Sequence, residues 1–284
     1  MKKYLICLLV GLFSTTFALY SRENPTGFAP LFFGPNALQI PDLLDGRTKS
    51  HLEAHVAGDA FYHYNNKDWT SDIFLQLHIP LFTERVNLTL WMPALEWHKS
   101  VPEPYAGDVY ISTDMMVVKE YRFCPSFTLR SMLKTASGEH TDMKRFYDSP
   151  GYCFDLSTGK SFYFNKGYLH YEDRQNANVE LRLSGTIGFL CWQTKEAAQN
   201  DAVYYGLQIS LYSKHLQLTQ NWSGYYGWED YGDQPMAIKT KIGFPIKAFQ
   251  PYFYYQYGLK DYPFHQFRVG LSYQWDILKK VNKG

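Results

Sequence analysis

The sequence predicts an all-β fold in which about twelve antiparallel strands close into a transmembrane β-barrel. Three observations lead to this prediction. Apolar and polar residues alternate along segment after segment, the connections between these segments are alternately short and long, and the chain begins with an export signal. After that signal, no run approaches the roughly 18 consecutive apolar residues that a membrane-spanning helix needs.

The alternation is clearest in the stretch SDIFLQLHIPL, residues 71–81. Large aliphatic residues occupy every second position from Ile73 to Leu81, and the positions between them include Asp72, Gln76 and His78. Successive side chains of a β-strand point to opposite faces, so one face of this strand is aliphatic and the other is mostly polar. A membrane barrel turns such an apolar face to lipid and the polar face to its lumen.

The same pattern recurs along most of the chain and predicts twelve strands. They cover residues 51–64, 71–81, 85–92, 108–117, 127–134, 161–172, 179–191, 203–212, 215–222, 236–244, 249–257 and 267–275. The segment 161–172 has the weakest pattern, because Asn165-Lys166-Gly167 could itself form a hairpin turn. Most of these segments are of the length that suits a tilted strand crossing a bilayer.

The connections support an even number of strands with both ends of the barrel on the periplasmic side. After the second, fourth, sixth, eighth and tenth strands the connections are short, and they are residues 82–84, 121–125, 174–177, 213–214 and 245–247. After the third, fifth and seventh strands they are longer, and they are residues 96–106, 137–160 and 193–201. Membrane barrels have short periplasmic turns and longer external loops.

Residues 1–18 have the features of a cleaved signal peptide. Lys2 and Lys3 precede an apolar run, and Thr16 and Ala18 supply the small residues of a cleavage site. The net charge of +1 falls to −1 once both lysines are removed, and no basic face argues for a nucleic-acid partner. An odd set of cysteines remains, Cys124, Cys153 and Cys191, which predicts structural thiols and not a paired disulfide framework.

Three segments fall outside the alternating pattern. Residues 19–49 are rich in Pro, Gly and Phe, and we expect a periplasmic segment that packs against the periplasmic mouth or binds a partner as a strap. Residues 137–160 form the longest predicted external loop, which we expect to fold into the mouth as a plug or lid. The barrel itself is predicted to occupy residues 50–275, followed by a tail, residues 276–284.

The polar faces of the strands predict a lumen of mixed charge. The lumen-lining candidates are Glu53, Asp59, Asp72, Gln76, Asp114, Arg130, Lys134, Arg182, Gln208, Lys239, Lys241 and Arg268. Acidic residues come from the first four strands, and basic residues come from the fifth to seventh and tenth to twelfth. Opposed charges could orient a polar solute in a pore, or they could pair as a salt-bridge core. Twelve strands lie between a filled barrel and an open channel, so both interpretations stand.

Histidines gather on the first two predicted strands. His51, Glu53 and His55 share one face, and a hairpin turn at Asn66-Lys67 would place His55 directly opposite His78. Two imidazoles and a carboxylate can hold a transition metal or respond to pH. Such residues are more often ordinary polar groups of the lumen.

The chain resembles bacterial outer-membrane β-barrel proteins as a class, over about residues 50–275. The resemblance lies in the signal peptide, the alternation, the aromatic strand ends and the last strand, FRVGLSYQW. That strand is similar to the aromatic-ended terminal strand that the barrel-assembly machinery recognises, although DILKKVNKG follows it here. The resemblance implies the outer membrane of a Gram-negative bacterium, with outer-membrane lipids and the assembly machinery as partners.

A narrow pore for small polar solutes is the function that these patterns favour, with no cofactor. The alternatives are a lipid-modifying enzyme of the outer membrane and a structural barrel that anchors partners. Outer-membrane phospholipase, another twelve-stranded barrel, uses a His/Ser/Asn constellation. The one His-x-Ser of this chain, His98 to Ser100, lacks that family's surrounding motif. A chance match therefore explains it best, and a fold alone assigns no chemistry.

Overall fold

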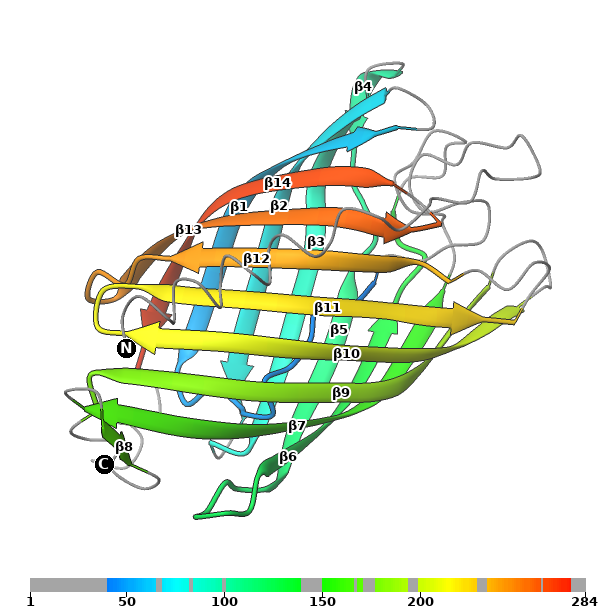
Figure 1. Cartoon of the computed structure of the whole chain (residues 1–284). Coiled ribbons are helices and arrows are strands. Elements are labelled where there is room, and N and C mark those ends of the chain that lie inside the picture. Colours follow the sequence, from blue (N-terminus) through cyan, green and yellow to red (C-terminus); the bar gives the residue numbers. More distant parts are fainter. Residues whose placement is uncertain are drawn as a thin grey trace.

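The computed structural model describes residues 40–64, 68–81, 84–98, 101–138, 150–165, 168–170, 177–193, 199–228, 234–261 and 263–276. Twelve long strands close into one antiparallel barrel, as predicted (Figure 1). They are β1 (Leu52–His63), β2 (Asp68–Pro80), β3 (Val86–His98), β5 (Tyr110–Val118), β6 (Ser126–Lys134), β7 (Gly151–Asn165), β9 (Val179–Gln193), β10 (Gln199–Ser213), β11 (Gln217–Gly227), β12 (Met236–Gly243), β13 (Phe249–Lys260) and β14 (Phe264–Trp275). The first and last strands close the barrel by pairing from Leu52 with Trp275 to His63 with Phe264.

Two short strands lie outside the closed ring. Strand β4 (Val101–Tyr105) pairs with the end of β3, and β8 (Tyr168–His170) pairs with the end of β7. The β7–β8 pair brackets residues 166–167, where the sequence allowed a hairpin turn. The described residues contain no helix long and apolar enough to cross a membrane.

The two ends of the barrel differ in their connections. We call the end with the β2–β3, β5–β6, β10–β11 and β12–β13 connections the turn end, and the opposite end the loop end. Residues 214–216 and 244–248 form two of the short turns, whereas residues 99–109 and 135–150 connect strands at the loop end. One connection at the turn end is longer than the predicted residues 174–177, because β7 ends at Asn165 and β9 begins at Val179, with β8 between them.

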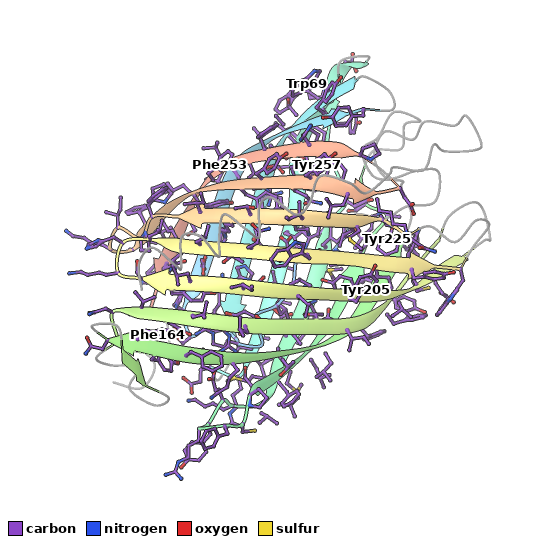
Figure 2. The ribbon with its side chains drawn as sticks, viewed as in Figure 1. Trp69, Phe164, Tyr205, Tyr225, Phe253 and Tyr257 are labelled. Carbon is purple, nitrogen blue, oxygen red and sulfur yellow. The ribbon has the colours of Figure 1, made fainter. Side chains whose placement is uncertain are left out.

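The outer face of the barrel is apolar, with aromatic residues near both ends (Figure 2). Exposed aliphatic residues occupy the middle of the strands, and they include Val56, Leu75, Leu129, Leu183, Leu207 and Val269. Exposed aromatic residues flank them: Trp69, Trp97, Tyr152, Tyr226 and Trp228 towards the loop end, and Phe244, Phe249, Tyr273 and Trp275 towards the turn end. An apolar band between two aromatic girdles is the exterior of a transmembrane barrel.

Strand β7 begins earlier than the sequence pattern predicts. The predicted strand was 161–172 and the predicted loop was 137–160, but residues 151–160 belong to β7 and pair with β6 and β9. Gly151, Ser157 and Gly159 are small or turn-forming residues that resemble a loop. In the structure they face the crowded lumen, while Tyr152, Phe154 and Leu156 face outwards.

The segment before β1 enters the barrel. We call residues 40–49 the strap, and they lie inside the lumen. Figure 1 shows them as an irregular dark blue segment before β1. We expected residues 19–49 to pack against the periplasmic mouth or to bind a partner as a strap. Residues 40–45 instead contact the inner wall of the barrel, while Thr48 and Lys49 contact Glu84 and Asn87 at the turn end. The charged lumen residues bind this segment, as described below.

Several predicted features lie outside the described residues. They are the signal peptide 1–18, the segment 19–39, the Asn66-Lys67 turn, residues 139–149 of the predicted loop, Lys99 and Ser100 of the His-x-Ser match, and the tail from residue 277. The side chain of His98 also lies outside them. Cys124, Cys153 and Cys191 are free thiols.

Candidate functional site

The half of the lumen nearer the turn end contains a cavity of about 1000 Å³. We call this half the turn half and the other the loop half. The cavity reaches Glu84 and Lys119 at the turn end and extends to Trp91 and Tyr110 inside the barrel. Most of the residues that line it are polar, and they include Gln76, Thr89, Ser112, Asp114, Gln208, Thr219, Asn221, Lys241 and Gln250. Such a cavity can hold water and small polar solutes.

The loop half is packed with large side chains instead. One buried cluster contains Ile40, Leu43, Tyr110, Met132, Cys153, Leu190, Trp192, Ala202, Tyr204, Tyr225 and Ala237. Tyr225, labelled in Figure 2, is 0% exposed and meets Trp192 edge-on at 5.4 Å. Trp91 stacks on Tyr110 with ring centres 3.5 Å apart and closes the inner end of the cavity. The lumen therefore contains a cavity in one half and a packed apolar cluster in the other.

Lumen side chains bind the backbone of the strap. Lys239 donates hydrogen bonds to the carbonyl oxygens of Ile40 at 3.0 Å and Pro41 at 3.3 Å. Tyr204 also donates to the Pro41 carbonyl at 3.1 Å, and Arg130 donates to that of Asp42 at 2.8 Å. Because these donors come from β12, β10 and β6, the strap is held from several sides of the barrel.

Charged groups fix the other end of the strap. Arg182 donates to the Asp45 carbonyl at 2.7 Å, and Arg47 bridges Asp45 and Glu180 at 2.8 Å each. The backbone at Gly46 has a φ of 76°, which favours glycine. A Cβ on Gly159, on β7, would lie 2.3 Å from the Asp45 carbonyl oxygen, so glycine at that position lets the strap approach the wall.

The carboxylates of the strap are held ionised by these cations. Burial raises the pKa of Asp42, but Lys239 and Arg268 outweigh it and lower the pKa to about 2. The Asp42 side chain lies inside the barrel and faces the cavity, so 64% of its surface remains exposed there. Burial likewise raises the pKa of Asp45, and the charges of Arg47 and Arg182 outweigh it and hold that pKa below its usual value.

Ion pairs neutralise most of the basic residues that the sequence places in the lumen. Arg130 pairs with Asp155 at 2.6 Å, Lys134 with Asp108 at 2.5 Å, Arg182 with Glu120 at 2.6 Å, Lys239 with Asp42 at 2.9 Å and Arg268 with Asp59 at 2.6 Å. Five of the six basic lumen-lining candidates therefore form ion pairs, as the salt-bridge interpretation of the lumen charges predicted.

All twelve lumen-lining candidates lie on inward-facing positions of the strands, but they do not gather in one site. Seven line the cavity: Glu53, Gln76, Asp114, Arg130, Gln208, Lys241 and Arg268. The other five do not line it: Asp59, Asp72, Lys134, Arg182 and Lys239. Of these five, Arg182 and Lys239 bind the strap.

The histidines lie together in a different register from the predicted one. His55 pairs with Gln76 and not with His78, which pairs with Glu53. The reason is that His63 pairs with Asp68, which leaves residues 64–67 as a longer connection than a two-residue turn.

The histidine rings nevertheless remain close, with the centres of His55 and His78 at 5.5 Å. His55 lies 2.8 Å from Glu53 and His51 lies 3.4 Å from it, while His78 contacts Thr89 at 2.9 Å. Within the described ranges, no three His, Cys, Asp or Glu side chains form a group that could hold a metal ion.

The strap and Tyr252 are the main features of the lumen that sequence reasoning missed. The strap has no alternation, and only the charges of Asp42, Asp45 and Arg47 hint at a charged binding surface. Tyr252 lies in a strand rich in Tyr and Phe, so nothing in the sequence distinguishes it from its neighbours.

Solved structures of bacterial outer-membrane barrels are similar to this chain. An outer-membrane channel from Pseudomonas putida F1 matches with a TM-score of 0.52 and 12% identity, over 84% of this chain and 97% of that one. The NanC porin matches with a TM-score of 0.49 and 8% identity, and the KdgM porin with 0.45 and 11%; each match covers 77% of this chain and 98% of the porin. No protein-family model matches the chain, and a comparison with curated proteins gives no match.

The closed ring of twelve strands, the apolar outer band and the first of these similarities define the class. The chain has the fold of a bacterial outer-membrane β-barrel. At this level of identity the similarity shows the fold and does not assign a function.

Proposed function

We propose that this protein is a narrow outer-membrane channel for small polar solutes and that the structure represents its closed state. The observation that carries the proposal is the cavity of about 1000 Å³ inside the turn half, most of whose lining residues are polar. A barrel that served only as a scaffold could fill this space with side chains, as small barrels do. In barrels of this class the short turns are periplasmic, so the cavity would open to the periplasm.

The barrier to passage is the loop half together with the strap. Ile40 and Leu43 of the strap pack in the apolar cluster, and a Cβ on Gly206 of β10 would lie 2.5 Å from Leu43. Passage therefore requires this part of the strap to leave the cluster. The polar contacts of the strap, such as those of Lys239 and Arg130, are of a kind that water can replace.

The structurally similar protein from Pseudomonas putida F1 is named an outer-membrane channel. That name agrees with the proposal, which rests on the cavity of this chain.

Planar-bilayer conductance of the refolded protein tests the proposal. The chain from residue 19 should conduct weakly, because the strap and the apolar cluster narrow the lumen. A variant that lacks residues 19–48 should conduct several-fold better, since part of the barrier is removed. Heat-modifiable migration on gels confirms that both forms are folded barrels. If neither folded form conducts ions, the channel proposal is wrong.

A further inference from the structure

Lys241 differs from the other basic residues on the inner wall of the barrel. Four of the others each pair with a carboxylate: Arg130, Lys134, Arg182 and Lys239. Arg268 donates two hydrogen bonds to the Asp59 carboxylate, both at 2.6 Å. Lys241, on the cavity wall, forms no ion pair with any residue that the structure describes. Its ammonium instead lies 4.4 Å from the ring centre of Tyr252.

A glycine positions Tyr252 beside this lysine. Tyr252 is on β13, and the neighbouring position on β14 is Gly270. A Cβ on Gly270 would lie 2.5 Å from Cζ and 2.6 Å from the hydroxyl oxygen of Tyr252, so the ring lies across β14 where a side chain is missing. It thereby reaches β1, where it meets the ring of His55 edge-on at 5.8 Å.

These contacts form a continuous polar surface on one wall of the cavity. It runs from Lys241 through Tyr252 and His55 to His78. The Lys241 ammonium lies within 6 Å of the Tyr252 ring centre, and so do the ring centres of each following pair of neighbours from one another. All four residues line the cavity. Among the described residues, the Tyr252 hydroxyl has no hydrogen-bond partner, and it is not sealed away from the cavity.

Two acidic groups act on the charge of Lys241, and both are already paired with other lysines. Glu53 accepts a hydrogen bond from Lys49 at 2.6 Å, and Asp42 of the strap pairs with Lys239 at 2.9 Å. Lys241 therefore contributes one positive charge that no carboxylate of the described residues pairs with directly. A partly buried charge is costly unless an opposite charge or hydrogen bonds compensate it, and an anion from solution can provide both.

We propose that Lys241 and Tyr252 form a binding site for a small monoanionic carboxylate. The ammonium balances the single charge, and the Tyr252 hydroxyl donates a hydrogen bond to a carboxylate oxygen. This inference deepens the proposed channel function, on which it rests, because it names the class of solute that the cavity holds.

The test compares lactate with lactamide, its neutral amide of nearly the same size. Binding to the refolded full chain in detergent is followed by ligand-observed NMR. Lactate should bind, and lactamide should bind more weakly by about tenfold, the factor expected for losing a charge-assisted contact. Lys241→Gln should weaken lactate binding by about tenfold and leave lactamide binding unchanged.

Matched variants separate the site from the general charge of the lumen. Lys160→Gln removes the same charge from the cavity wall, but Lys160 is paired with Glu120 at 3.0 Å, so lactate binding should change less than about twofold. Tyr252→Phe keeps the ring and removes the hydroxyl, and it should weaken lactate binding several-fold. This variant also tests the site if Lys241→Gln fails to fold, which the heat-modifiable migration of each variant reveals.

Equal binding of lactate and lactamide overturns the proposal, as do equal losses in Lys241→Gln and Lys160→Gln. The NMR measurement does not require solute to cross the membrane. A protein that binds lactate through Lys241 but never conducts would refute the channel and leave the site in place, whereas a conducting protein without this selectivity would refute the site alone.

Discussion

The two halves of the lumen are built from the same twelve strands, yet they differ in almost every physical property. In the loop half, side chains such as Trp192, Tyr204 and Tyr225 are at most 3% exposed and pack as a core. In the turn half, polar side chains surround a cavity of about 1000 Å³ and a charged strap. The strap crosses the boundary, because Ile40 joins the core while Asp45 and Arg47 join the ion pairs.

The difference shows that a barrel of this size need not be uniformly open or filled. Interior volume is filled where large side chains such as Trp192, Tyr204 and Tyr225 pack together, and it remains open beside Gln76 and Thr89. The loop half contributes packing energy, whereas the turn half presents polar side chains to the cavity.

The largest expected effect is in the core of the loop half. Trp192→Ala should lower the free energy of unfolding by about 3–5 kcal/mol, because it removes a large buried side chain and leaves a cavity. Gln76→Ala, on the cavity wall of the turn half, should change it by less than about 0.5 kcal/mol. Urea unfolding of the refolded proteins in lipid vesicles measures both. Similar costs would show that the two halves are packed alike.

The ion pairs that hold the strap are the next test. Arg182 is 0% exposed and binds Asp45, Glu120 and two serines, so Arg182→Met should cost about 3 kcal/mol by leaving buried groups without a partner. Lys119 pairs with Glu84 in water, with side chains 61% and 54% exposed, and Lys119→Met should cost less than about 1 kcal/mol. The same unfolding measurement applies, and a cost for Arg182→Met no larger than that of the exposed pair would contradict this account.

Adjacent residues of β2 test whether the turn half is wet. Leu75, near the middle of the strand, faces outwards and Gln76 faces the cavity. Leu75→Arg should cost about 2–4 kcal/mol, the scale for a basic residue near the bilayer midplane, whereas water in the lumen can solvate the new charge of Gln76→Arg. Refolding stability in lipid distinguishes them. Equal costs would mean that β2 does not separate lipid from water.

The bend of the strap should have a smaller effect. Gly46→Ala places a Cβ at a positive φ and within 2.8 Å of the Gly159 nitrogen, so it should cost about 1–3 kcal/mol. Gly58→Ala on β1 meets no atom within 4 Å and should be neutral or slightly stabilising. Both variants are compared by urea unfolding. An equal response would indicate that the strap adapts to the added methyl group.

The smallest effect concerns the pH dependence of the strap. The pKa of Asp42 is lowered from 3.8 to about 2 in the folded protein, so its contribution is complete above pH 3.8 and is lost as the pH falls through 2. Asp42→Asn should therefore be slightly less stable than the wild type at pH 6, and most of this difference should be gone at pH 2. The effect is small because the carboxylate faces water in the cavity. Unfolding curves at both pH values measure it, and a difference of the same size at pH 2 would contradict this assignment.

The sequence predicted best those strands that have one face towards lipid and the other towards the cavity. Alternation along 71–81 placed Leu75 and Leu77 outside and Gln76 inside, because lipid and water impose opposite requirements on the two faces of one strand. The prediction failed at residues 151–160, where Gly and Ser face a crowded lumen. There, small residues in a strand cannot be distinguished from those of a loop by periodicity.

The sequence by itself determined that the chain forms a barrel of twelve strands with an apolar exterior and a charged interior. Only the tertiary structure decided which of these charges are neutralised, because pairing depends on distances between residues such as Arg268 and Asp59, 209 positions apart. It also decided that residues 40–49 enter the lumen. The strap has no period of its own, and its conformation is imposed by carbonyl contacts to Arg130, Arg182 and Lys239 on strands that are brought together only when the barrel closes.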